Sequence, residues 1–209
     1  MAKGPGKAVD KILVVGICGS LRPESHTRAA LKVALEGAEE GGARTDLIDL
    51  REYNLPFCDG KDDRADRPDV RRLRDAVRPA QGVILSTPEY HGSLSGSLKN
   101  ALDLMGFDEF EGKMIGLVGV SGGAIGAIGG LEALRQIGRA LHAWVVPLQA
   151  SIAQADQAFG PDGRPTDKRQ EDRLKEVGRQ VAQFACLHNV ENAFDFMKAW
   201  EEAHPNPGG

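Results

Sequence analysis

The sequence predicts a three-layer α/β/α sandwich built around a mostly parallel β-sheet. Two observations carry this prediction. Short, continuous apolar segments alternate along the chain with longer segments in which apolar residues recur at helical spacing. In addition, each parallel strand pair needs a long crossover connection, which is usually a helix. Repeated strand–helix units therefore favour one sheet with helices on both faces.

The first unit begins with residues 11–18, KILVVGIC, a continuous apolar run that is too short for a helix and predicts a fully buried strand. From Ser25 the pattern changes, because apolar residues between 30 and 38 share one helical face. The pair Gly41–Gly42 then supplies a stop signal for this helix.

The second and third units repeat this alternation. Residues 45–50 are strand-like, and residues 68–77 have helical periodicity. Residues 82–86, GVILS, predict another buried strand, and apolar residues at helical spacing between 94 and 105 predict the helix that follows it.

The last two units are less regular. Residues 114–120 predict a strand, which a Gly-rich turn connects to a helix within 126–141. Residues 142–147 predict the last strand, and residues 166–188 an amphipathic helix. Because Pro147 has no N–H to donate to a sheet, this strand either lies at a sheet edge or ends there.

The length of 209 residues and the hydrophobic content of 41% are typical of one domain. We expect a flexible leader over residues 1–10, the domain over residues 11–195 and a tail over residues 196–209.

The composition argues against several classes of partner. Lys and Arg total 26 against 30 Asp and Glu, so the net charge of -4 provides no general attraction for nucleic acid. The apolar run at 12–18 is much shorter than the roughly 20 residues that span a membrane. Three widely separated cysteines suggest neither a disulfide framework nor a metal site. We expect no nucleic acid, membrane or metal partner and a cytoplasmic location.

Ligands of such sheets bind at the carboxyl ends of the strands, so the loops that follow the strands are where a site is expected. The first loop carries the hydroxyls of Ser20, Ser25 and Thr27 together with the guanidinium of Arg22. Hydroxyls, an arginine and a helix N-terminus together favour a phosphate site. The alternative is a helix cap, for which Ser25 alone is enough.

Other motifs do not match this loop. Gly16 and Gly19 lack the spacing of a dinucleotide fingerprint, and no Gly-Lys-Ser/Thr precedes the helix. Cys18 and Arg22 enclose three residues, whereas a thiol phosphatase loop needs five. We expect Cys18 to be a packing residue at the strand end rather than a redox group.

The second loop, TPEYHGSLSG at 87–96, leads into the helix segment SLKNALDLM. Together with GSLRPESHT at 19–27, it resembles the NADPH-dependent FMN reductase family of flavodoxin-like proteins, which includes flavin, quinone, chromate and azo-dye reductases. The resemblance covers about residues 11–150 and includes the order of the motifs. It implies a flavodoxin-like sandwich with a five-stranded parallel sheet in the order 2-1-3-4-5.

The resemblance also implies the cofactor-binding residues. The positions in the phosphate loop are Ser20, Arg22, Ser25, His26 and Thr27. The segment along the flavin ring comprises Pro88, Glu89, Tyr90, His91, Gly92 and Ser93. The loop beside the pyrimidine side of the flavin comprises Ser121, Gly122 and Gly123. Thr27 and His91 depart from the Asn that many relatives carry at these positions.

Side-chain roles within the second loop have alternatives. Tyr90 either contacts the ring or is a half-buried loop aromatic, and His91 either contacts the ring or is a solvated turn residue. Glu89 is either a catalytic acid or, as we favour, a structural partner whose backbone contacts the flavin.

The implied activity is an FMN-dependent NAD(P)H oxidoreductase. Hydride passes from NADPH or NADH to FMN and then to a quinone, flavin, metal-oxyanion or azo acceptor, and no catalytic side chain is needed because the flavin carries the chemistry. The alternatives are a flavodoxin-type electron carrier and a binding protein that has lost the flavin. Relatives imply a homodimer or homotetramer, in which the helices at 94–105 and 126–141 either form the interface or bury their apolar faces within one subunit.

Overall fold

The computed structural model describes residues 12–61 and 67–189 of the chain. The expected leader over residues 1–10, the tail over 196–209 and the last residues of the expected domain, 190–195, lie outside these described residues. No helix in the described ranges is both long and apolar enough to cross a membrane.

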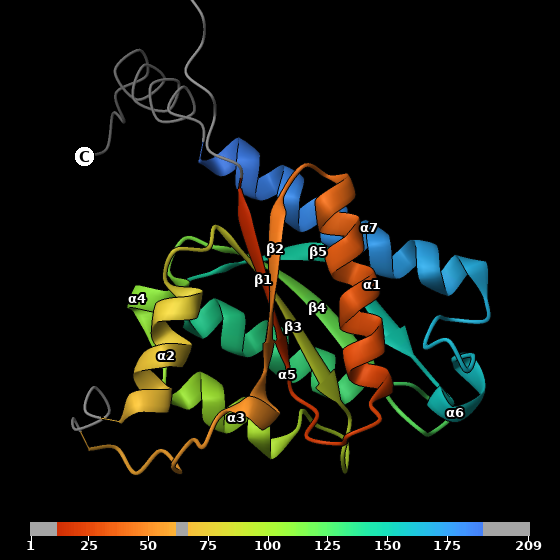
Figure 1. Ribbon diagram of the computed structural model, residues 1–209, viewed down its shortest axis with the longest axis horizontal. Helices are drawn as coiled ribbons and strands as arrows, with labels where there is room; N and C mark the ends of the chain where they lie inside the picture. Colours follow the sequence, from red (N-terminus) through yellow and green to blue (C-terminus); the bar gives the residue numbers. More distant parts are fainter. Residues whose placement is uncertain (1–11, 62–66, 190–209) are drawn as a thin grey trace, which may run out of the picture.

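A five-stranded parallel sheet forms the centre of the fold, as the sequence predicts (Figure 1). Its strands are β1 (Leu13–Cys18), β2 (Arg44–Asp49), β3 (Gly82–Pro88), β4 (Met114–Val120) and β5 (Trp144–Ile152). They are arranged in the order β2-β1-β3-β4-β5. This order confirms the flavodoxin-like topology. From β1, the chain adds β2 on one side of the sheet and β3, β4 and β5 on the other. The boundary between β1 and β3 is thus the point where the strand order reverses, and ligands of open parallel sheets bind at such points.

Helices follow each strand. They are α1 (His26–Glu40), α2 (Pro68–Val77), α3 (Gly96–Asp103), α4 (Phe107–Phe110), α5 (Ile128–Ala140), α6 (Ala155–Ala158) and α7 (Lys168–His188), with a 3₁₀ turn, η1 (Leu50–Glu52), after β2. The predicted boundaries of the longer helices are confirmed within a few residues. The short α4, α6 and η1 were not predicted, because single turns leave no periodic pattern.

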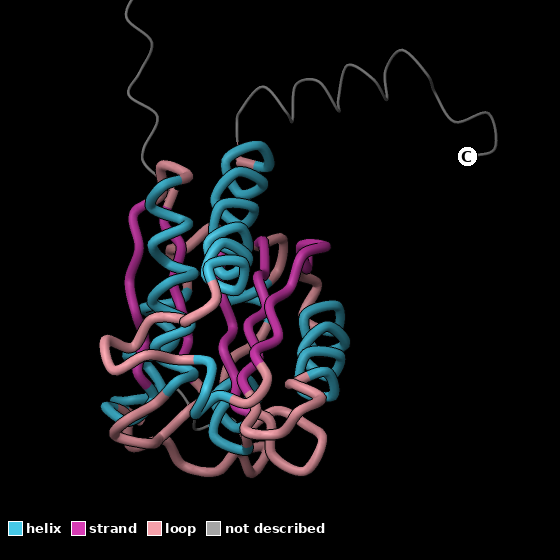
Figure 2. Tube along the Cα trace, turned by 90° about the vertical axis from the view of Figure 1, so that its right-hand side faces the viewer, coloured by secondary structure: helices cyan, strands magenta, loops and turns pink. Residues whose placement is uncertain are grey.

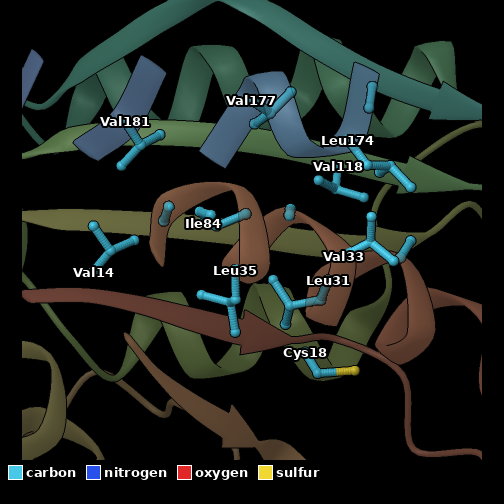
Figure 3. Close-up of a cluster of buried hydrophobic side chains, with 14 of the residues drawn as sticks. Val14, Cys18, Leu31, Val33, Leu35, Ile84, Val118, Leu174, Val177 and Val181 are labelled. Atoms are coloured by element: carbon cyan, nitrogen blue, oxygen red, sulfur yellow. The ribbon is translucent and has the colours of Figure 1, made fainter. Parts of the chain in front are cut away.

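The two faces of the sheet bury separate clusters of apolar side chains. One cluster lies between the sheet and the pair α1 and α7, and includes Leu31, Val177 and Val181 (Figure 3). The other lies under α2, α3, α4 and α5 and includes Leu73 and Leu131. These two clusters make the three layers that the strand–helix alternation predicts.

Close packing of α1 against α7 holds α1 in place. A Cβ atom at Gly178 of α7 would lie only 1.8 Å from the carbonyl oxygen of Ala34, and one at Gly37 only 2.0 Å from that of Lys175. Glycine at both positions therefore allows the two backbones to touch. Because α1 is clamped in this way, its N-terminus has a defined position at the carboxyl end of the sheet.

The last strand differs from the prediction in one respect. The expectation that the strand ends at Pro147 is wrong, since β5 continues to Ile152. The alternative, that the strand lies at a sheet edge, is confirmed. The pairing with β4 shifts register, because Ile115 pairs with Val145 but Leu117 pairs with Gln149. This irregularity takes Pro147 out of the regular ladder, so its missing N–H costs no strand hydrogen bond.

The loops after β1, β3, β4 and β5 gather at one end of the sheet, the lower end in Figures 1 and 2. This is the carboxyl end of all five parallel strands, where the candidate site residues are found.

Candidate functional site

A cavity of about 360 Å³ opens at the carboxyl ends of β1, β3 and β4. Three loops predicted to bind the cofactor meet there, and the following residues line it: Ser20, Arg22, Glu24, Ser25, His26, Thr27, Pro88, Glu89, Tyr90, Val120, Ser121, Gly122, Gly123, Ala155 and Asp156. Of the residues that the sequence analysis assigns to the site, only His91, Gly92 and Ser93 are not part of this lining. The structure thus brings together segments separated by about a hundred residues of chain.

The loop before α1 forms one end of the cavity. Ser25 is the N-cap of α1, and its Oγ accepts a hydrogen bond from the backbone N–H of Arg28 across 3.2 Å. Within the described ranges, no acceptor pairs with the backbone N–H groups of His26 and Thr27, and the hydroxyl of Thr27 has no hydrogen-bond partner. The two interpretations of this loop, as a helix cap and as a phosphate site, are therefore compatible. The cap uses only the hydroxyl of Ser25 and leaves the other donors available.

The charge at this end also suits an anion. Arg22 is exposed, and no acidic side chain in the described part of the chain pairs with it. The first turn of α1 contains no acidic residue that would offset the positive end of the helix dipole. Unpaired backbone N–H groups, an arginine guanidinium and a helix N-terminus are the groups with which proteins commonly bind phosphate.

The loop after β3 contains a tight turn. Tyr90 and Ser93 exchange backbone hydrogen bonds of 3.0 and 3.2 Å, and the two residues between them, His91 and Gly92, have φ of 52° and 80°. Positive φ at both central residues is the pattern of a type I′ turn. His91 is therefore exposed at the tip of this turn and does not line the cavity. This position agrees with the interpretation of His91 as a solvated turn residue.

The Glu89 side chain has a structural partner, which is the role favoured for it from the sequence. Its Oε2 accepts a hydrogen bond from the backbone N–H of Gly130, in the first turn of α5, across 2.8 Å. Nearby, a Cβ atom at Gly129 would lie 2.1 Å from the carbonyl oxygen of Gly92. The loop after β3 and the start of α5 therefore pack against each other directly, which explains Gly129 of the Gly-rich segment without a ligand.

The loop after β4 is supported by the chain that follows β5. The N–H groups of Gln154 and Ala155 donate to the carbonyl oxygens of Gly123 and Ser121, each across 3.0 Å. Asp156, next along the chain, lies 3.4 Å from Nε2 of His26 through its Oδ1. The ring of His26 also stacks on Phe159, with 5.0 Å between ring centroids. Ala155 and Asp156 of this segment line the cavity together with the loop after β4.

Ala155 and Asp156 are site residues that the sequence analysis missed. A usable signal exists, because they follow a strand that neighbours β4 and so lie at the carboxyl end of the sheet. Ending that strand at Pro147 rather than at Ile152 placed its carboxyl end too early. Glu24 and Val120, the other unpredicted lining residues, are next to predicted ones.

Cys18 lies beneath the first loop and is completely buried. It contributes to the cluster under α1 in Figure 3, and burial raises the pKa of its thiol. A buried, protonated thiol does not act as a nucleophile. The prediction that Cys18 is a packing residue is therefore confirmed.

The cavity suits a ligand that combines a phosphate with a flat ring. Donors gather at the end formed by Ser20, Arg22 and Thr27, while Pro88 and Tyr90 supply flat, mostly apolar surface on another wall. FMN has both of these parts, so the residues present fit this cofactor. Within the described ranges, no group of three His, Cys, Asp or Glu side chains is arranged to hold a metal ion.

Comparison with known proteins agrees with this geometry. Residues 12–157 match the family described as NADPH-dependent FMN reductase. An FMN-dependent NADPH-azoreductase of Staphylococcus aureus (strain USA300) is 36% identical over 151 residues, which cover 70% of this chain and 80% of the relative. An NADPH azoreductase of Bacillus sp. (strain OY1-2) is 33% identical over 155 residues, which cover 73% of this chain and 84% of the relative.

A solved structure is also similar. It is the flavoenzyme FerB, an NAD(P)H:(acceptor) oxidoreductase from Paracoccus denitrificans, with a TM-score of 0.70 and 27% sequence identity. The match covers 86% of this chain and 100% of FerB.

Proposed function

Because the chain belongs to the NADPH-dependent FMN reductase family, we propose that it uses FMN, held in the cavity at the carboxyl ends of β1, β3 and β4, to oxidise NADPH or NADH. The observation that carries the proposal is the set of free donors at one end of this cavity, in the first turn of α1. When bound, FMN supplies the hydride-accepting and electron-donating chemistry, so the protein's part is to bind, orient and protect it.

The residues of the first loop hold the phosphate in this proposal. The backbone N–H groups of His26 and Thr27 and the hydroxyls of Ser20 and Thr27 donate hydrogen bonds, and Arg22 adds a charge-assisted contact. Ser25 contributes by capping α1 and so fixing the position of the free N–H groups.

The ring is held between the β3 and β4 loops. Pro88, Glu89 and Tyr90 supply one wall through backbone and aromatic surface, and Ser121, Gly122 and Gly123 approach from the neighbouring strand. Gly92 and Ser93 belong to the turn that shapes the β3 loop, and His91 lies at its exposed tip, where it can contact a second substrate. In this proposal one face of the ring stays open, so that a donor and then an acceptor can reach it in turn.

Azo compounds, quinones, free flavin and metal oxyanions are the acceptor classes that we propose. The names of the two azoreductase relatives support an azo acceptor, and the acceptor oxidoreductase from Paracoccus denitrificans supports a broad range. All of these accept electrons from an exposed reduced ring without a specialised side chain, so the cavity itself does not discriminate among them.

We also propose a homodimer or homotetramer located in the cytoplasm. Ile125, in the loop before α5, and Ile128, the first residue of α5, are 83% and 53% exposed. Ile128 adjoins Gly129, which packs against the loop after β3. Large exposed apolar side chains next to a site are typical of a surface that a second subunit covers. All three cysteines are free thiols, as is usual in a reducing compartment.

The first experiment mixes the FMN-loaded protein anaerobically with NADPH, and separately with NADH, while the visible absorbance of the flavin is recorded. Rapid bleaching is expected. Bound flavin that stays yellow would indicate an electron carrier instead, and failure to bind FMN would refute the cavity assignment. Arg22→Ala should weaken FMN binding, whereas Arg44→Ala, which removes an exposed arginine at the opposite end of the sheet, should not.

A further inference from the structure

Arg28 makes contacts that the family motifs do not explain. It belongs to the first turn of α1, yet only 9% of it is exposed, and its guanidinium turns back under the phosphate loop. Nη2 donates to the backbone carbonyl oxygens of Ser20 and Arg22 across 3.3 and 3.2 Å, and Nη1 donates to that of Pro23 across 3.1 Å. One side chain therefore holds three carbonyl groups of a four-residue stretch of loop.

The charge of Arg28 is balanced from the neighbouring strand. Its Nε lies 2.7 Å from Oδ2 of Asp49, the last residue of β2, and Nη2 donates to Oδ1 across 3.3 Å. Arg51 pairs with the same carboxylate across 2.7 Å and reaches the carbonyl of Pro23 across 3.4 Å. Burial alone would raise the pKa of Asp49, but hydrogen bonds from Arg51 and Arg28 hold that pKa below its usual range. The carboxylate of Asp49 therefore forms ion pairs with two arginines and anchors both of them.

This arrangement controls which backbone groups face the cavity. A carbonyl group and the N–H of the next residue point in roughly opposite directions across a planar peptide. By holding the carbonyls of Ser20, Arg22 and Pro23, the guanidinium takes their negative ends out of the cavity. The two arginines and one carboxylate also leave a net positive charge behind the loop, which favours an anion in front of it.

We propose that Arg28, anchored by Asp49, is a positioning residue that preorganises the loop for the phosphate of FMN. This inference rests on the proposed function, since it assumes that the loop binds that phosphate. Arg28 itself contacts the back of the loop, so it acts through the backbone rather than on the ligand. Preorganisation of this kind increases affinity by removing the cost of ordering the loop during binding.

The test compares FMN with riboflavin, which has the same ring but no phosphate, by quenching of flavin fluorescence on titration of the apoprotein. Arg28→Met should raise the dissociation constant for FMN at least about tenfold, as expected when hydrogen bonds to a charged group are lost. Riboflavin affinity should change less than about twofold, since the ring walls do not depend on Arg28. Lysine cannot replace the planar fork of donors, so Arg28→Lys should not restore FMN binding.

Lys32→Met is the matched control. Lys32 lies one turn further along α1, is exposed and has no charged partner in the described ranges, so its loss should leave both affinities unchanged. Asp49→Asn removes the anchor's charge without changing its shape and should weaken FMN binding in the same selective way. Circular dichroism and chemical unfolding of each apoprotein show whether the variant folds. If Arg28→Met does not fold, Arg28→Lys and Asp49→Asn carry the test.

The outcomes separate this inference from the proposed function. Equal losses of FMN and riboflavin affinity would mean that Arg28 only stabilises the fold, and unchanged affinities for both flavins would mean that Arg28 does not position the loop. Either result would refute the inference while leaving the site assignment intact. If the unmodified protein does not prefer FMN over riboflavin, and Arg22→Ala has no effect, the phosphate assignment itself fails.

Discussion

Glu89 accepts a hydrogen bond from the backbone N–H of Gly130 across 2.8 Å, which joins the loop after β3 to the first turn of α5. The N-cap residue of α5, Ala127, has no side chain that could accept this kind of bond. A carboxylate from another loop therefore performs the capping role, and it also lies favourably against the helix dipole.

Removal of this cap should destabilise the protein. We expect Glu89→Ala to lower the free energy of unfolding by about 1 kcal/mol, the usual value of a helix N-cap. Glu89→Gln, which keeps an acceptor oxygen, should lose less. Glu132→Ala is the control, since Glu132 is exposed on the same helix. Urea unfolding of the three variants measures the differences, and equal stabilities for Glu89→Ala and Glu132→Ala would contradict the capping role.

Tyr90 lines the cavity with 45% of its surface exposed. If it contacts the flavin ring, Tyr90→Ala should weaken FMN binding about threefold to tenfold, because aromatic pairs are worth roughly 0.5–1.5 kcal/mol. The visible absorption bands of the bound flavin should shift as well. Phe57→Ala removes an exposed aromatic side chain that lies outside the cavity lining and should have neither effect. An unaltered spectrum and affinity in Tyr90→Ala would remove Tyr90 from the ring contacts.

Asp156 places a negative charge at the rim of a cavity proposed to bind a phosphate, and only His26 pairs with it in the described part of the chain. Asp156→Asn should therefore tighten FMN binding by about twofold to fivefold, the scale of an exposed charge interaction. The gain should shrink as salt is added, since ions screen such charges. Asp172→Asn, on the exposed surface of α7, serves as the control. Weaker FMN binding in Asp156→Asn would show that the carboxylate has a positive role, such as orienting His26.

The buried side chain of Lys113 should make the free energy of unfolding depend on pH in the alkaline range. Its Nζ donates to the carbonyl oxygens of Val77 and Arg78 at the end of α2, and burial lowers its pKa from 10.5 to about 8. Below pH 8 the lysine is protonated in both the folded and unfolded states. Above it the folded protein releases the proton while the unfolded chain retains it, so unfolding takes up a proton and the free energy of unfolding rises with pH.

Lys113→Met should remove this contribution. Denaturant unfolding at several pH values between about 7 and 10 is expected to show the unmodified protein gaining stability relative to the variant across the interval set by the two pKa values. Parallel pH profiles for the two proteins would show that Lys113 keeps its ordinary pKa in the folded state.

The sequence was sufficient to predict the main helices and strands, because each buries one apolar face and the resulting periodicity is local. It also located one of the loops that line the cavity, since hydroxyls, Arg22 and a helix start occur within a few residues of one another. It misjudged β5, whose edge position and shifted register tolerate Pro147. That error hid Asp156, which follows the true end of the strand.

What the sequence by itself determined, then, is the alternation of strands and helices and the chemistry of the loops between them, because these depend on neighbouring residues. Only the tertiary structure decided which carbonyls Arg28 would hold, that Asp49 would anchor it from a different strand, and that Glu89 would cap a helix beginning some forty residues away. The physical reason is that a hydrogen bond or ion pair needs its partners within about 3 Å. Chain folding brings distant segments to that distance, and no local pattern in the sequence records it.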